Sequence, residues 1–111
     1  MVTAVDYTTV VKQVLYEYAE YYAAENEPPL RPVFDDMQHS YLLVESGWYA
    51  NDYVHHTVIH IDMLDQKIWI QWDETEEGIA TDLVAAGIPH TAIVLGFRHP
   101  TVRALTEFAV G

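Results

Sequence analysis

Two segments with β-type alternation meet at Asp65-Gln66, and their register constrains the fold more than any other feature of the sequence. If these two residues form a tight hairpin loop, Leu64 faces Lys67 and every earlier residue acquires a fixed partner. One set of alternate pairs is then apolar throughout: Met63 with Ile68, Ile61 with Ile70, and Ile59 with Trp72. The other set is of mixed polarity: Asp62 with Trp69, His60 with Gln71, and Val58 with Asp73. The sequence therefore predicts a hairpin with an oily face and a second face, called here the mixed face.

The segment before the strands has helical periodicity. From Val5 to Glu25 the larger apolar residues recur at intervals of three and four, at Tyr7, Val10, Val11, Val14, Leu15, Tyr18, Tyr21 and Tyr22. Thr3 and Asp6 resemble a capping box at its start, and Pro28-Pro29 ends it. We expect this apolar stripe, tyrosines included, to lie in the core.

Two further strands precede the hairpin. Leu30 to Asp35 is predicted to be an edge strand because Pro32 cannot donate to a ladder on both sides. Tyr41 to Trp48 follows, then Tyr53 to Met63 and Lys67 to Asp73, separated by turns at Ala50-Asn51-Asp52 and Asp65-Gln66. The expected fold is a two-layer α+β domain, in which the long helix covers the oily face of an antiparallel four-stranded meander.

Downstream of the hairpin we expect a helix, a short strand or turn, and a C-terminal helix. Thr75 is predicted to cap the first helix, with Glu76 and Glu77 in its first turn. Gly87 is predicted to end that helix in a Schellman motif, with Ile88 packed on Leu83. The apolar run from Ala92 to Phe97 indicates a short strand, and Pro100 begins a helix through Phe108.

Composition narrows the class of protein. A chain of 111 residues is expected to form one domain, residues 1–111, and the absence of cysteine excludes disulfides, thiolate metal sites and a catalytic thiol. With 17 acidic and 5 basic side chains the formal charge is −12, which disfavours direct binding to nucleic acid or to an anionic membrane. No apolar run is long enough to span a bilayer, so we expect a cytoplasmic protein.

Motifs for catalysis or metal binding are weak. His56, His60 and Asp62 alternate on one predicted strand and could ligate a metal, but a histidine satisfied by its neighbours is the commoner arrangement. The carboxylates of Asp73, Glu74, Glu76 and Glu77 could act as an acid–base pair, but a helix start explains acidic residues there equally well. We therefore predict no catalytic, metal or cofactor site, with a small metal-dependent hydrolase as the least favoured alternative.

Aromatic residues on the mixed face are the more informative feature. Indole rings in a partly polar sheet face are typical anchors for a protein partner, and the predicted interface is Trp48, Val58, His60, Asp62, Trp69 and Gln71. The alternative is that the C-terminal helix or the loop after Pro89 covers these rings.

The sequence resembles the XisI family, the fdxN element excision controlling factors of cyanobacteria. The resemblance lies in Val58-Ile59-His60-Ile61-Asp62, Lys67-Ile68-Trp69-Ile70-Gln71, Asp73, Thr75-Glu76 and Gly78-Ile79-Ala80, and continues in Gly87-Ile88-Pro89, Ile93-Val94-Leu95-Gly96-Phe97, Pro100, Arg103 and Thr106-Glu107-Phe108-Ala109. Gly47-Trp48 and the opening helix also fit, so nearly the whole chain is covered. Asp65-Gln66 and Glu74 depart from the family pattern, where Asp-Gly and Gly are usual.

The resemblance implies a small α+β protein that works with a XisH-like, nuclease-related partner and the site-specific recombinase XisF in DNA excision. That system acts during heterocyst differentiation to restore a nitrogen-fixation operon, and the family supplies no catalytic residues. Because this chain carries a charge of −12, we expect it to act through protein contacts. A second hypothesis is that acidic clusters at Glu17, Glu20, Glu25 and Glu27 and at 73–77 mimic DNA and mask a basic surface on the partner. A homodimer is left open.

Overall fold

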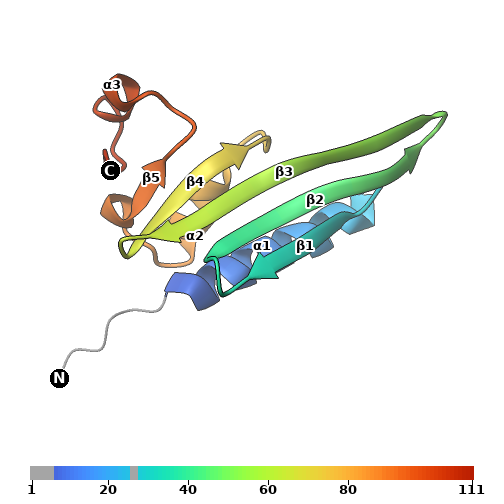
Figure 1. Cartoon of the computed structure of the whole chain (residues 1–111), viewed down its shortest axis with the longest axis horizontal. Coiled ribbons are helices and arrows are strands. Elements are labelled where there is room, and N and C mark those ends of the chain that lie inside the picture. Colours follow the sequence, from blue (N-terminus) through green and yellow to red (C-terminus); the bar gives the residue numbers. More distant parts are fainter. Residues whose placement is uncertain (1–6, 26–27) are drawn as a thin grey trace.

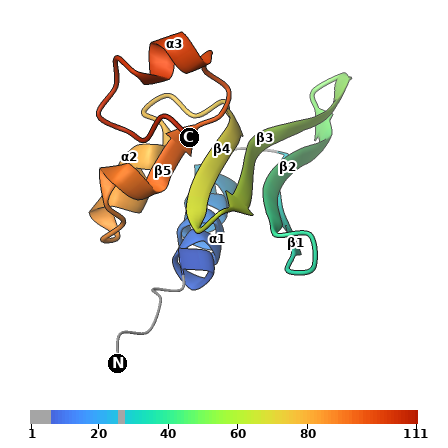
Figure 2. The same cartoon turned by 60° about the vertical axis from the view of Figure 1, so that its left-hand side comes forward.

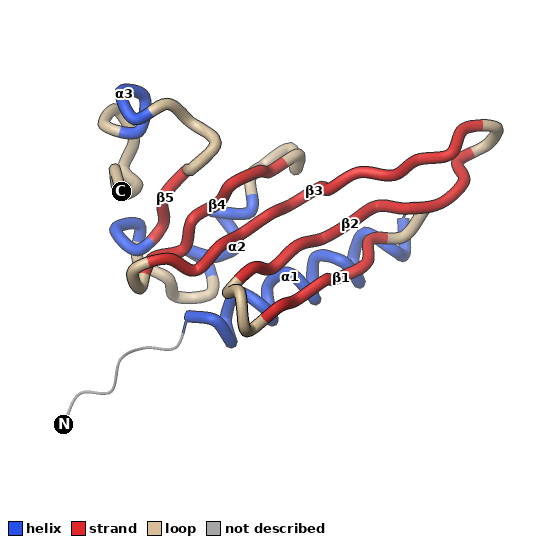
Figure 3. Tube along the Cα trace, viewed as in Figure 1, coloured by secondary structure: helices blue, strands red, loops and turns tan. Residues whose placement is uncertain are grey.

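The computed structural model describes residues 7–25 and 28–111, with only the backbone of 23–25. The elements in chain order are α1 (Tyr7–Glu25), β1 (Leu30–Asp35), β2 (Ser40–Tyr49), β3 (Asp52–Leu64), β4 (Lys67–Asp73), α2 (Ile79–Ala85), a 3-10 turn (His90–Ala92), β5 (Ile93–Leu95) and α3 (Pro100–Arg103). Figure 1 shows the sheet in front of α1 and α2, and Figure 3 shows the same arrangement coloured by element type. The predicted α+β fold with a helix packed on the sheet is confirmed.

The sheet has the order β1-β2-β3-β4-β5. Strands β1 to β4 form the predicted antiparallel meander, with β1 at the edge. The two-residue loop is also confirmed: Leu64 pairs with Lys67, and both Asp65 and Gln66 have positive φ, 51° and 63°, as a type I′ turn requires. A fifth strand, β5, adds parallel to β4.

Two β-bulges interrupt the meander, and the one in the β3–β4 pair changes the predicted register of the hairpin. The pairs Met63–Ile68, Ile61–Ile70 and Asp62–Trp69 are as predicted. Beyond them the register shifts, so that His60 pairs with Trp72 and Ile59 with Asp73, and the predicted Ile59–Trp72, His60–Gln71 and Val58–Asp73 pairs are wrong. A second shift, between Leu43 and Val44, leaves Val58 as an extra residue on β3. Each extra residue breaks the two-residue side-chain period.

The core lies between the sheet and the two longer helices. Val11, Leu15, Leu43, Ile61 and Ile70 are fully buried members of one apolar cluster. The helical stripe is therefore confirmed in its aliphatic positions, and Tyr7, Tyr18 and Tyr22 pack at its margin. Tyr21 contradicts the prediction, because 70% of its surface is exposed. The predicted capping box at Thr3 and Asp6 lies outside the described residues.

Helix α2 begins later than predicted and ends as predicted. Its N-cap is Gly78, so Glu76 and Glu77 precede the helix, and Thr75 does not cap it directly. Instead the Asp73 carboxylate accepts hydrogen bonds from the backbone N of Ile79 (2.7 Å) and from the backbone N of Thr75 (2.8 Å). At the other end the amide of Ile88 donates to the Leu83 carbonyl (3.1 Å) and Gly87 has φ 104°, which completes the Schellman motif.

The C-terminal segment is less helical than predicted. Helix α3 ends at Arg103, and the chain continues in turns, with an isolated bridge between Ala109 and Val94. Phe108 is partly buried against the core outside any helix. The Arg103 guanidinium explains part of this path, since it donates to the carbonyls of Leu95, Arg98, Gly96 and Val110. Figure 2 shows this segment beside β5, at the opposite end of the sheet from β1. No helix among residues 7–25 and 28–111 is long and apolar enough to cross a membrane.

Candidate protein-contact surface

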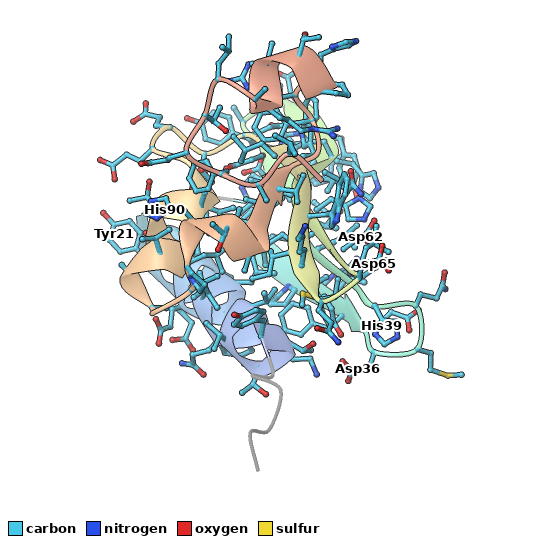
Figure 4. The ribbon with its side chains drawn as sticks, turned by 90° about the vertical axis from the view of Figure 1, so that its left-hand side faces the viewer. Tyr21, Asp36, His39, Asp62, Asp65 and His90 are labelled. Atoms are coloured by element: carbon cyan, nitrogen blue, oxygen red, sulfur yellow. The ribbon has the colours of Figure 1, made fainter. Side chains whose placement is uncertain are left out.

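One face of the sheet is turned away from α1 and α2, and we call it the open face. Partners across the strands share a face, so the pairing defines its rows. Figure 4 shows Asp62 on this side, with Tyr21 and His90 on the side of the helices. The rows, from the tip of the β2–β3 hairpin inward, are Trp48 and Tyr53; Ser46 and His55; Arg31, Val44 and Thr57; Val33, Leu42, His60 and Trp72; Asp35, Ser40, Asp62 and Trp69; and Leu64 and Lys67.

Asp62 is the centre of a polar network on the open face. Its carboxylate accepts hydrogen bonds from Ser40 Oγ (2.6 Å), from His60 Nε2 (2.9 Å) and from Gln71 Nε2 (3.3 Å). Burial opposes ionisation of this carboxyl, but the hydrogen bonds from Ser40, His60 and Gln71 outweigh it and lower the pKa of Asp62. The structure thus brings together three of the predicted interface residues, Asp62, His60 and Gln71, in a network satisfied within the chain.

Trp69 is partly covered by the C-terminal segment. The Arg103 guanidinium lies 5.2 Å from the centre of its ring, and Gly111, whose carbonyl accepts a hydrogen bond from Lys67 Nζ, lies next to the indole. The alternative considered from the sequence, an intramolecular cover, is therefore correct for Trp69. It does not hold for Trp48, which is 66% exposed.

Val58 was predicted to lie in the interface, but in the structure its side chain is in the core. As the extra residue of the β3 bulge it is only 8% exposed and belongs to the core cluster. The same kind of irregularity on β4 has the opposite effect on Trp72, which was predicted to lie on the oily face. Trp72 pairs with His60, is 50% exposed, and donates its Nε1 hydrogen to Glu74 Oε2 (2.8 Å). Trp72 is thus an exposed apolar residue of the open face that the sequence did not predict, and Val58 is not part of that face.

Sequence reasoning did not identify all of the exposed aromatic residues at the end of the β2–β3 hairpin, which are Trp48, Tyr49 and Tyr53 and are called here the aromatic tip. Trp48 and Tyr53 pair across the β2–β3 hairpin with their ring centres 5.2 Å apart and their planes at 69°. Tyr53 and Tyr49 are 58% and 63% exposed. Figure 1 shows that this hairpin projects beyond the rest of the sheet, so the rings stand at the end of an arm. Three aromatic residues, Trp48, Tyr49 and Tyr53, flank the short turn at 50–52 in the sequence, and this was the signal that could have identified them as a group.

The metal hypothesis does not fit the observed geometry. Because of the bulge at Val58, His56 pairs with Glu45 and lies on the other side of the sheet from His60 and Asp62. Its Nε2 atom lies 3.4 Å from a carboxylate oxygen of Glu45 and 3.4 Å from one of Glu74. Within the described part of the chain, no cluster of three or more His, Asp or Glu side chains is arranged to hold a metal ion.

On the side of the helices, the acidic residues line a groove between α1 and α2. One part of it has a volume of about 550 Å³ and is lined by Val14, Glu17, Tyr18, Tyr21, Glu77, Asp82, Ala85 and Ala86. An adjoining part is lined also by Glu74 and Glu76. Burial, together with the charges of Glu77 and Asp73, raises the pKa of Asp82. Of the two acidic clusters noted in the sequence, Glu17 and 74–77 converge here. Glu20 does not, because it lines a separate hollow with Leu30 and Pro32, and the side chains of Glu25 and Glu27 lie outside the described residues.

Comparisons with known proteins agree on one family. The family model described as XisI protein matches residues 1–110. A crystal structure of a XisI-like protein from Anabaena variabilis superposes with a TM-score of 0.86 at 31% identity, covering 98% of this chain and 100% of that one. The fdxN element excision controlling factor XisI from Anabaena variabilis superposes with a TM-score of 0.72 at 35% identity, covering 96% and 100%. A comparison with curated proteins found no match.

Proposed function

This chain belongs to the XisI family, and on that premise we propose that it is a controlling factor for excision of a DNA element, acting through protein contacts made by the open face. The observation that carries the proposal is its 35% identity, over 96% of its length, to a protein described as an fdxN element excision controlling factor. The match covers 100% of that protein's chain, so the two proteins share nearly all of their fold.

The arrangement of polar groups supports a role in binding over a role in catalysis. The Asp73 carboxylate is occupied by the backbone amides that precede and begin α2, and Asp62 is occupied by three hydrogen-bond donors. A general acid or base must be free to exchange a proton with a substrate, and neither group is. By contrast, Trp48 and Trp72 are 66% and 50% exposed. Tryptophan is among the residues most enriched in the contacts that dominate the binding energy of protein interfaces.

Charge supports an indirect action on DNA. A chain with a formal charge of −12 repels the phosphate backbone, so its influence on excision has to pass through another protein. The XisH-like protein and the recombinase implied by the family resemblance are the candidates for that protein. The XisH-like partner is the one we propose for direct contact.

The test is a pull-down, in which this chain is immobilised and the retention of the XisH-like protein from the same organism is measured. Wild type is expected to retain it, and Trp72→Ala is expected to lose at least about tenfold in affinity, the effect of removing a well-buried aromatic anchor. Tyr21→Ala removes a similarly exposed ring from the side of the helices and should have no effect. Absence of retention by wild type, or equal retention by Trp72→Ala with its circular dichroism unchanged, would refute the proposed surface.

A second candidate function is masking of a basic surface on a nuclease-like partner. The observation that favours it is the convergence of Glu17, Glu74, Glu76, Glu77 and Asp82 along one groove that no Lys, Arg or His side chain lines. Such a groove could mimic the charge spacing of a nucleic acid. Titration of this chain into a complex of the XisH-like protein with labelled duplex DNA at low salt tests the idea, and absence of displacement would exclude it.

A further inference from the structure

We propose that a second copy of this chain docks on the open face, so that two open faces pack against each other around a twofold axis. The inference rests on the proposed function, because the second copy and the XisH-like protein would occupy the same open face in turn. It also assigns a role to the projecting β2–β3 hairpin, where Trp48 and Tyr53 pack on each other and stay more than half exposed.

Charge is the first argument for a second copy. Two chains that each carry −12 repel one another, so their association is favoured at a surface from which carboxylates are missing. The four outer rows of the open face provide such a surface, since their residues include no Asp or Glu and one cation, Arg31. They are Trp48, Tyr53, Ser46, His55, Arg31, Val44, Thr57, Val33, Leu42, His60 and Trp72.

The order of these rows is the second argument, because it is self-complementary. Large rings stand in the first row, Trp48 and Tyr53, and again in the fourth, where Trp72 is the largest side chain. The two rows between them hold the smaller side chains Ser46, Val44 and Thr57, together with His55 and Arg31. A twofold axis that lies across the strands between the second and third rows would place the first row of each copy over the fourth row of the other. A symmetric interface requires this reciprocity, and aligned packing of two sheets about 10 Å apart permits it.

The distances along the strands agree with this arrangement. The side chains on one face repeat about every 6.8 Å along a strand, so four rows span about 20 Å. Four rows are therefore long enough for the tip of one copy to lie over the row of Trp72 and His60 in the other. Over that row Trp48 and Tyr53 would lie above Leu42 and His60, with Val33 and Trp72 on either side.

The exposed area is sufficient for a small stable interface. Trp48, Tyr53 and Trp72 expose 66%, 58% and 50% of their surfaces. With about 150–250 Å² for each aromatic residue, these three expose about 260–430 Å² per copy. The low end of stable interfaces is about 600 Å² per partner, and the other residues of the four rows supply the remainder. The acidic groove stays exposed on the far side of each copy.

The test is the mass of the purified chain by light scattering after gel filtration, measured over a range of concentrations. We expect wild type at about 100 µM to show twice the 12.7 kDa of one chain. Trp48→Ala, which removes the indole of the aromatic tip, and Thr57→Glu, which places a carboxylate next to the axis in each copy, should each raise the dimer dissociation constant at least tenfold. Tyr21 and Thr91 are exposed and lie outside the open face, so Tyr21→Ala and Thr91→Glu should leave the dimer dissociation constant unchanged.

A monomeric wild type at that concentration would overturn the inference, and so would a dimer that Trp48→Ala and Thr57→Glu leave intact. These outcomes are separable from those for the proposed function. If wild type is monomeric while retention of the XisH-like protein still depends on Trp72, the second copy is wrong and the partner surface stands. If the chain is dimeric through the open face and retains the partner regardless of Trp72, the dimer stands and the partner surface is wrong.

Discussion

Replacing Asp62 with Asn tests whether the polar network fixes the open face. The substitution keeps the shape of the side chain and removes the charge that accepts from Ser40, His60 and Gln71. Hydrogen bonds to a charged acceptor contribute about 1.5–3 kcal/mol each and neutral ones about 1 kcal/mol. Since the amide still accepts from one or two donors and the site is partly exposed to water, we expect a loss of about 1–2 kcal/mol in the free energy of unfolding.

The dependence of this loss on pH follows from the lowered pKa of Asp62. A carboxyl whose pKa is lower in the folded than in the unfolded chain stabilises the fold at pH values above its unfolded pKa. That contribution disappears as the pH falls through the folded pKa, because the carboxyl is then protonated in both states. The difference between wild type and Asp62→Asn should thus be constant at neutral pH and shrink below the ordinary carboxyl value of 3.8.

Urea unfolding followed by circular dichroism measures both effects. Asp65→Asn is the matched control, because it removes a carboxylate from the exposed hairpin turn at a positive φ that Asn adopts readily. We expect it to change the stability by less than about 0.5 kcal/mol. If Asp62→Asn is no more destabilising than Asp65→Asn at pH 7, or if its effect grows as the pH falls below 4, the network does not stabilise the fold as argued.

Three further substitutions test the packing that positions the open face, each by thermal unfolding. Gly96→Ala would place a Cβ 2.6 Å from Gln71 Oε1 and 3.1 Å from the Ile70 carbonyl, so we expect a loss of about 1–3 kcal/mol, and an unchanged melting temperature would contradict the close approach. Asp73→Ala leaves the amides at the start of α2 without their acceptor and should cost about 1–2 kcal/mol; a neutral result would mean that water replaces the carboxylate. Gly87→Ala meets no atom within 4 Å, so its cost, about 1 kcal/mol, should come from φ 104° alone, and a much larger loss would point to a clash that the structure lacks.

The sequence was sufficient to predict the bounds of those elements whose side-chain periodicity is long and regular. Strand β4 lies at its predicted bounds, and β2 and β3 differ from theirs by one residue at each end, because alternating side chains report directly which face a strand buries. The end of α2 was also predictable, since Gly87 and Ile88 form a motif contained in a few consecutive residues.

What could not be predicted depends on neighbours in space. The bulges at Val58 and at Gln71-Trp72 arise from pairing with β2 and β3, and nothing in a single strand marks which residue is skipped. Because of the bulges, Val58 lies in the core, Trp72 lies on the open face, and His56 lies on the other side of the sheet from His60. The residues of the candidate site therefore differ from the prediction, although the strand bounds nearly agree with it. The early end of α3 similarly reflects the pairing of Ala109 with Val94, which lies on another strand.

Side-chain footprinting by hydroxyl radicals tests the central claim most directly, namely that the open face contacts other proteins and the side of the helices does not. Trp48, Tyr53 and Trp72 report on the open face, and Tyr16 and Tyr21, exposed by 53% and 70% on α1, report on the other side. At concentrations where the chain is associated, or with the XisH-like protein bound, we predict that the first three become protected from oxidation while the two tyrosines of α1 stay reactive. Protection of Tyr16 and Tyr21 with no change at Trp48, Tyr53 and Trp72 would contradict the account.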